Sequence, residues 1–472
     1  MDYSTASLVD TADAIAAGRT RVRDVVEACL DRYRRIGGRL ACFVELDEAG
    51  AIDAAERADR TLRDGGSTGP LFGVPLAHKD LYYRSGRVSA CGSQLREDFR
   101  PASTATVLER LDAAGGIDIG RLAMVEFAMG PHGFNANYDH CRNPWNTDYI
   151  PCGSSSGSGV AVAARLVHAS LGSDTGGSIR CPAAVSGVVG LVPTHGRVSR
   201  FGVMPMSPSM DIVGPLARTA RDCARVFDII AGHDPKDGST FTRSADGAEA
   251  CLEQVDRLPR IGIAHGYFDA DLHPEVAAAH DAALVALRDA GFEIRDVTLP
   301  ADLLQEVADL HPLLMKVEAA ANHMPDMRST QDRYTTEVGL RLQAGFFPPG
   351  TEYVQSLKLR GAYLRAIAAS AFADVDLLFT PVLSIPVPTI EETTNKRGTD
   401  YLDMVVALTR NTKVVNYLGL PAISVPCGFT GNGLPVSFQL IGRPFAETQL
   451  LIAADRFQHE TDWHRREPEL IH

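Results

Sequence analysis

Lysine is scarce in this chain. Only 6 of its 46 lysine and arginine residues are lysine, and Lys79 is the only one among the first 235 residues. A chain that prefers arginine for ion pairs needs another reason to keep a lysine, because arginine stays protonated whereas a buried lysine can become neutral and act as a base. We therefore expect proton transfer at Lys79. The alternative is an ordinary lysine at the end of a strand.

Other features are missing as well. The formal net charge is −13, which argues against nucleic acid or an anionic membrane as the main partner. No basic start precedes an apolar segment, and no apolar run is long enough to span a bilayer. The nine cysteines include no C-x-x-C pair, which argues against a disulfide framework or a zinc site and favours a reducing compartment. We expect a cytoplasmic protein without a metal or cofactor.

Glycine and small hydroxyl residues gather in two clusters, residues 151–159 and 171–180. Between them lies an apolar run, residues 160–169, that has the character of a helix. Successive N–H groups in a glycine-rich turn can point into one concavity and hold a developing negative charge. Ser178 follows two glycines and is therefore a candidate nucleophile beside its own oxyanion hole. A surface loop would explain one cluster, but linkers lack such an apolar helix.

Several motifs together resemble the amidase signature family. The principal ones are Gly-Val-Pro-Leu-Ala-His-Lys-Asp at 73–80, Gly-Ser-Ser-Ser-Gly-Ser-Gly at 153–159 and Gly-Ser-Asp-Thr-Gly-Gly-Ser-Ile-Arg at 172–180. The resemblance extends to residues 142–145, 193–199, 211–218, 420–426 and 439–443. Several motifs in the right order over most of the chain are far more specific than any one of them.

The family hydrolyses amides with a Ser-Ser-Lys triad, and the resemblance assigns its members here. Ser178 matches the nucleophile, Ser154 the bridging serine on a cis peptide bond, and Lys79 the base. Cys152 and His78 depart from the usual residues at their positions. Neither departure removes a catalytic group.

The backbone around the nucleophile also matches the family. The oxyanion-hole segment corresponds to three residues before Ser178, namely Thr175, Gly176 and Gly177. Asp174 and Arg180 flank this loop with opposite charges, and we expect them to form a pair that braces it. We expect Ser155 to hydrogen-bond within the loop.

The chain alternates between strand-like and helical patterns, which predicts an α/β fold with helices on both faces of one large mixed sheet. Residues 7–64 read as helices, and residues 260–297 read as a strand, a helix and a parallel strand. Residues 300–372 read as mainly helical, whereas residues 391–400 read as an exposed loop. The resemblance implies about eleven strands in this sheet.

We expect residues 1–472 to form a single domain with four parts. A helical lead-in (1–66) precedes the signature core (70–235). A more variable, substrate-shaping part (236–375) leads to returning strands and a closing helix (376–472). The resemblance makes a homodimer plausible.

The resemblance implies an enzyme that hydrolyses a small amide through an acyl-enzyme on Ser178 and releases ammonia or an amine. Ureido and carbamate compounds such as biuret and urethanes remain open as substrates. An alternative is the amidase-like subunit of a glutamine- or asparagine-dependent amidotransferase, which would carry the same motifs. Residues 132–138 resemble those of stand-alone hydrolases of the family, which favours the hydrolase. A non-catalytic relative would have lost a triad position, and none is lost.

Two competing motifs fit less well. Residues 153–157 also satisfy G-x-S-x-G, the nucleophile elbow of α/β-hydrolases, with Ser155 as its serine. An elbow follows a strand directly, but Pro151 precedes this segment. Residues 459–464 nearly match H-E-x-x-H, but the second histidine comes one position late, so the two rings do not share a helical face.

Overall fold

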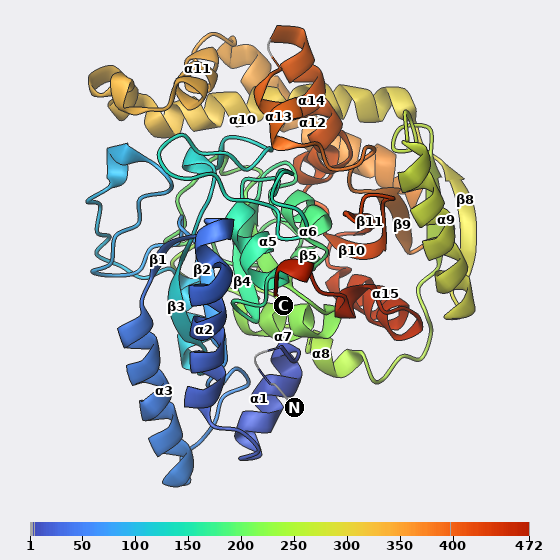
Figure 1. Ribbon diagram of the computed structural model, residues 1–472. Coiled ribbons are helices and arrows are strands. Elements are labelled where there is room, and N and C mark those ends of the chain that lie inside the picture. Colours follow the sequence, from blue (N-terminus) through green and yellow to red (C-terminus); the bar gives the residue numbers. More distant parts are fainter. Residues whose placement is uncertain (1–2, 4, 397, 472) are drawn as a thin grey trace.

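Eleven strands join in one mixed sheet in the part of the chain that the computed structural model describes, residues 3, 5–396 and 398–471 (Figure 1). The order across the sheet is β1-β3-β2-β4-β6-β5-β10-β11-β9-β7-β8. The strands are β1 (Phe43–Leu46), β2 (Pro75–Lys79), β3 (Ile117–Leu122), β4 (Ala169–Asp174), β5 (Val189–Val192), β6 (Ile212–Ala217), β7 (Ile261–His265), β8 (Ile294–Thr298), β9 (Leu377–Pro381), β10 (Ala422–Phe429) and β11 (Pro435–Gly442). This confirms the predicted fold class.

Helices occupy most of the remaining chain. They are α1 (Leu8–Ala16), α2 (Val22–Leu40), α3 (Glu48–Arg63), α4 (Thr106–Ala113), α5 (Ser156–Ala163), α6 (Arg180–Ser186), α7 (Ala220–Ile230), α8 (Ala248–Cys251), α9 (Pro274–Asp289), α10 (Ala301–Ser329), α11 (Thr336–Ala344), α12 (Gly350–Ala371), α13 (Ile390–Thr394), α14 (Gly398–Leu418) and α15 (Glu447–Glu460). Every helix in the described ranges is too short or too polar to cross a bilayer.

Both faces of the sheet are covered. Val213 of β6 packs in a cluster with α7, α9 and α15, whereas its neighbour Ile212 packs in another with α2 and α5. Successive side chains of a strand point to opposite faces, so these two clusters lie on opposite sides of the sheet. Helix α10 contacts α11, α12 and α14, and these four helices lie together at one end of the molecule (Figure 1).

The unit predicted for residues 260–297 is present. β7 and β8 pair in parallel, and α9 forms the crossover between them. β7 also pairs in parallel with β9, so the unit joins the edge of the main sheet. A short apolar strand, an amphipathic helix and a second strand were enough to predict this pairing, because parallel neighbours require such a connection.

Three local predictions were wrong. Residues 7–64 are not all helical, because β1 pairs with β3, a partner far away in sequence. The helix expected over residues 160–169 ends at Ala163, and Arg165 then takes φ +55 before β4 begins. Residues 391–400 contribute to two helices, and Thr389 starts the first with a capping box to Glu392.

Candidate active site

Lys79 lies at the end of β2, and its side chain reaches two serines. Its Nζ donates hydrogen bonds to Ser154 Oγ at 2.7 Å and to Ser173 Oγ at 2.8 Å. Lys79 is 1 % exposed and Ser154 is 0 % exposed, so both are buried. The Gly153–Ser154 peptide bond is cis. Two of the three predicted triad residues are therefore in contact.

The surroundings of Lys79 favour loss of its proton. Burial lowers the pKa of the ammonium from 10.5 to about 7, and the carboxylates of Asp174 and Asp211 offset part of that effect. No carboxylate accepts a hydrogen bond from Lys79 within the described residues. A neutral amine has two N–H donors and one lone pair, so it can donate to one serine and accept a proton from the other.

Ser178 lies in the turn between β4 and α6 and is partly exposed, unlike Lys79 and Ser154. Its carbonyl accepts a hydrogen bond from the Ser155 N–H at 3.3 Å, which joins the two glycine- and serine-rich segments. The Ser178 hydroxyl has no hydrogen-bond partner among the described residues. The structure thus brings the segment of Ser178 beside that of Ser154, with Ser178 partly exposed and Lys79 buried.

The backbone N–H groups of residues 175–178 fall into two sets, those with a hydrogen-bond acceptor and those without one. The Gly177 N–H donates to Asp174 Oδ1 at 2.7 Å. The N–H groups of Thr175, Gly176 and Ser178 have no acceptor in the described part of the chain. Gly177 has φ +130, and a Cβ there would lie 2.4 Å from Thr412 Oγ1, so only glycine fits this position.

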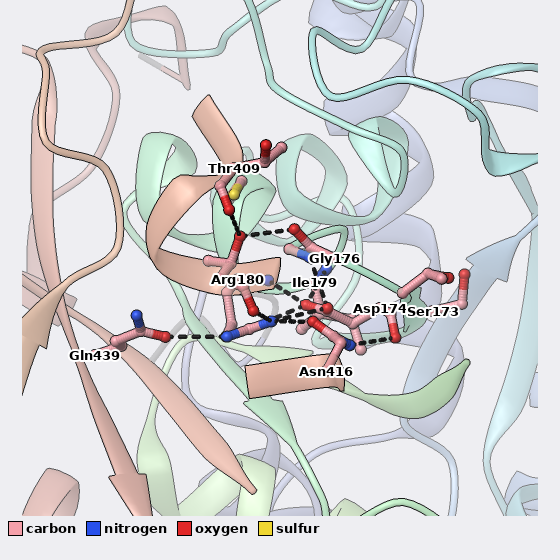
Figure 2. A network of polar contacts seen from close by, with 12 residues as sticks. Ser173, Asp174, Gly176, Ile179, Arg180, Thr409, Asn416 and Gln439 are labelled. Atoms are coloured by element: carbon pink, nitrogen blue, oxygen red, sulfur yellow. Dashed lines mark hydrogen bonds and ion pairs between the residues drawn. The ribbon is translucent and has the colours of Figure 1, made fainter. Parts of the chain in front are cut away.

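Asp174 and Arg180 form a fully buried ion pair, with Nη2 and Oδ1 3.0 Å apart (Figure 2). Burial acts to raise the pKa of Asp174, but the guanidinium and backbone N–H groups hold it below its ordinary value. The Asp174 carboxylate also accepts from the Ile179 N–H at 3.0 Å. A charge left here without its partner would cost about 3–5 kcal/mol. The predicted pair is present, and its bracing role remains a prediction.

Residues from distant elements complete this network (Figure 2). Arg180 Nη1 donates to Gln439 Oε1 of β11 at 3.1 Å, and Nη2 donates to Asn416 Oδ1 of α14 at 2.5 Å. Asn416 Nδ2 donates in turn to the Asp174 carbonyl at 2.9 Å. The turn is therefore attached to the sheet and to α14.

Ser155 joins the two segments and is not exposed. Its Oγ donates to the Ser173 carbonyl at 3.2 Å and accepts from the Ser173 N–H at 3.3 Å. The serine of a nucleophile elbow is exposed to its substrate. Ser155 is 0 % exposed, so a substrate could not reach its hydroxyl.

A cavity of about 360 Å³ lies beside the Ser154 loop. Val125 lines it, and the Val125 N–H donates to the Ser154 carbonyl at 3.2 Å. His132 also lines the cavity, and its Nε2 lies 3.1 Å from Glu337 Oε1. The lining combines residues 125–140 with residues from α11, α13 and α14.

The two unusual residues noted in the sequence are both buried. His78 Nδ1 accepts the Leu171 N–H at 3.1 Å, and burial lowers the pKa of His78 to about 4. The ring is thus neutral and connects β2 to β4.

Cys152 has φ +51 and lies just before the cis peptide bond between residues 153 and 154. No disulfide joins any two of the nine cysteines, and no group of three or more histidine, cysteine, aspartate or glutamate residues in the described ranges could hold a metal ion.

Comparison with known proteins identifies the family. A model of the amidase family matches residues 24–451, which is most of the chain. The chain belongs to the amidase signature family. This confirms the resemblance seen in the motifs, and it makes the protein an enzyme of the class that hydrolyses amide C–N bonds.

Curated relatives of this amidase include amidotransferase subunits. A glutamyl-tRNA(Gln) amidotransferase subunit from Chloroflexus aggregans is 38 % identical, with 100 % of this chain and 99 % of the relative aligned. The corresponding subunit from Pseudomonas aeruginosa (strain PAO1) is 36 % identical, with 98 % of each chain aligned.

Solved structures extend the comparison to hydrolases. A chain from a vestigial protein complex, described as revealing the evolutionary origins of an s-triazine catabolic enzyme, is 32 % identical with a TM-score of 0.89 over 96 % of this amidase and 98 % of that chain. A 6-aminohexanoate cyclic dimer hydrolase with bound substrate is 25 % identical with a TM-score of 0.89 over 99 % and 100 %. The glutamyl-tRNA(Gln) amidotransferase subunit from Thermotoga maritima is 28 % identical with a TM-score of 0.74 over 91 % and 90 %.

Sequence reasoning missed several residues of the amidase site. Ser173 lies within the motif at 172–180, yet nothing local shows that it contacts Lys79. Gln439 begins the motif at 439–443, but its type and spacing indicate no role for its side chain. Asn416 and Thr412 carry no local signal, because their contacts with the turn span more than 230 residues of chain.

Proposed function

We propose that this amidase hydrolyses a small amide by acyl transfer to Ser178. Neutral Lys79 takes a proton from Ser154, which takes one from Ser178 as its Oγ attacks the carbonyl carbon. The proton returns through Ser154 to the leaving nitrogen, which departs as ammonia or an amine. Water then cleaves the acyl-enzyme by the same relay.

The observation that carries this proposal is the 2.7 Å contact between Lys79 Nζ and Ser154 Oγ, with burial holding the pKa of the lysine at about 7. A base works best when its pKa lies near the working pH. Catalytic hydrogen bonds are often loose without substrate, so the unpartnered Ser178 hydroxyl does not oppose the relay. The N–H groups of Thr175, Gly176 and Ser178 are the proposed donors to the tetrahedral oxyanion. The Gly177 N–H, which the resemblance also assigned to this role, donates to Asp174 instead.

A second candidate is the glutamine- or asparagine-hydrolysing subunit of an amidotransferase. The 38 % and 36 % identical relatives, aligned over nearly the whole chain, support it more directly than they support a stand-alone hydrolase. The fold comparison favours the hydrolase, since the TM-score is 0.89 for the cyclic dimer hydrolase and 0.74 for the amidotransferase subunit. Both candidates use the same chemistry at Ser178 and differ in what receives the ammonia.

The experiment measures ammonia and amine release from a panel of alkyl and aryl amides, ureas, carbamates, glutamine and asparagine. Turnover of simple amides by the purified chain alone supports the stand-alone hydrolase. Activity confined to glutamine or asparagine, together with other subunits that co-purify, supports the amidotransferase candidate instead.

The rate should depend on pH through Lys79. Only the neutral amine accepts a proton, so kcat/KM should be low below pH 7, rise through about pH 7 and level off above it. A pH–rate profile measured with chemistry rate-limiting checks this. A profile that stays flat down to about pH 5 would contradict a lysine base.

Asp211 supplies the control for this profile. Burial raises the pKa of Asp211 to about 6, so its carboxyl could itself produce an acid limb. Its negative charge raises the pKa of Lys79, so Asp211→Asn should keep the limb and move it to lower pH. Loss of the limb in Asp211→Asn would assign it to the aspartate.

A further inference from the structure

A histidine from α10 contacts the proposed oxyanion segment. His311 Nε2 lies 2.8 Å from the Thr175 carbonyl oxygen, although the two residues are 136 positions apart in the chain. His311 is 4 % exposed, and burial lowers the pKa of its ring to about 4. The ring is therefore neutral near pH 7. Because a carbonyl only accepts, Nε2 carries the hydrogen and donates it.

This contact fixes the direction of one peptide group. In a trans peptide the C=O and the following N–H point in opposite directions. The Thr175–Gly176 bond is trans, so holding the Thr175 carbonyl toward His311 aims the Gly176 N–H away from it. Gly176 is partly exposed, and its N–H has no acceptor among the described residues.

The next peptide group is held differently. Thr412 Oγ1 of α14 donates to the Gly176 carbonyl at 2.6 Å, and the Gly177 N–H on the other side of that peptide donates to Asp174. Both ends of this peptide are thus occupied. Of the two neighbouring peptides, only the one held by His311 has an N–H left for a ligand.

The ring also packs directly against the turn. A Cβ on Gly176 would lie 2.9 Å from His311 Cε1, which is closer than real Cβ atoms approach. The position of the ring and the absence of a side chain at Gly176 therefore depend on each other.

We propose that His311 is a positioning residue that aims the Gly176 N–H at the oxyanion formed on the substrate carbonyl. The proposal rests on the function proposed above. Helix α10 belongs to the region expected to shape the substrate pocket, and this proposal assigns it a role in stabilising the oxyanion as well. A misaligned donor lowers the rate because the oxyanion forms only on the way to the tetrahedral intermediate, whereas the substrate in its ground state is bound as before.

The test uses three variants at one position. Glutamine can place an N–H near the site of the histidine Nε2, asparagine is too short to do so, and leucine has no donor. We expect His311→Leu and His311→Asn to lower kcat by about 10- to 100-fold with KM changed less than about threefold, and His311→Gln to recover most of the loss. A fluorophosphonate probe labels Ser178 and places a phosphoryl oxygen in the proposed oxyanion hole. Its labelling rate should fall in His311→Leu and His311→Asn and recover in His311→Gln, as kcat does.

Thermal melting of the variants measures loss of packing, whereas kcat measures alignment of the Gly176 N–H. Asparagine and glutamine both replace a buried ring by an amide, so a merely structural role would lower kcat similarly in both variants. Equal kcat in the two, wild-type kcat in His311→Leu, or a rise in KM with unchanged kcat would overturn the proposal. Activity that survives in Ser178→Ala would overturn the proposed nucleophile itself. Activity that requires Ser178 but does not change in the His311 variants would overturn only the positioning role.

Discussion

Ser178→Ala will abolish amide hydrolysis, with kcat falling by at least about 10⁴-fold. The alanine variant has no Oγ to attack the carbonyl carbon, so the acyl-enzyme cannot form. Alanine fits the turn without strain, because the Ser178 hydroxyl has no hydrogen-bond partner among the described residues. The fold and the Lys79–Ser154 contact should therefore be unchanged. Ammonia release and mass spectrometry of the trapped acyl-enzyme measure the effect.

A serine of the same tract provides the matched control. Ser158 Oγ of α5 donates to the Leu171 carbonyl at 3.4 Å, and its hydroxyl has no hydrogen bond to a proposed catalytic group within the described ranges. Ser158→Ala should keep most of the activity. Equal activity in wild type and Ser178→Ala would place the nucleophile elsewhere.

Lys79→Arg will be as inactive as Lys79→Met, each losing about 10²–10⁴-fold in kcat. Arginine keeps a positive charge and the donors of lysine, but it cannot accept the proton from Ser154. Methionine matches the length of lysine and has no base. If Lys79 only held Ser154 and Ser173 in place, arginine would preserve part of that function and methionine would not.

The buried position gives this prediction a second readout. Lys79 is 1 % exposed, and no carboxylate in the described part of the chain forms an ion pair with it. An arginine there would carry a permanent, unpaired charge, so Lys79→Arg should also melt at a lower temperature than wild type. Lys236 is the control, since it is exposed and pairs with Glu109 at 2.8 Å, and Lys236→Arg should leave kcat and melting unchanged. More than about a tenth of wild-type kcat in Lys79→Arg would contradict the assignment of the base.

Much of the fold follows from local patterns. The β7–α9–β8 unit was predicted in full, because short apolar strands and an amphipathic helix occur there in uninterrupted order. β1 was missed because four residues carry little periodicity and the strand forms only by pairing with β3. The early end of α5 was missed because the apolar run continues past Ala163, whereas the backbone turns at Arg165.

The sequence by itself determined the chemical groups. The lone lysine of the first 235 residues, two serines and a pair of glycines at fixed spacing are the groups that we propose as base, relay, nucleophile and close-approach turn. Each of these depends on residue type and short spacing, which a linear chain displays directly. The family follows from several such motifs in order.

Only the tertiary structure decided how these groups are tuned and held. Burial sets the pKa of Lys79 near 7, and burial depends on everything that packs around β2. Arg180 finds its partners on α14 and β11, and His311 reaches the Thr175 carbonyl from α10. Hydrogen bonds require atoms within about 3 Å of each other, and folding brings them that close from positions more than 100 residues apart without leaving a pattern in either segment.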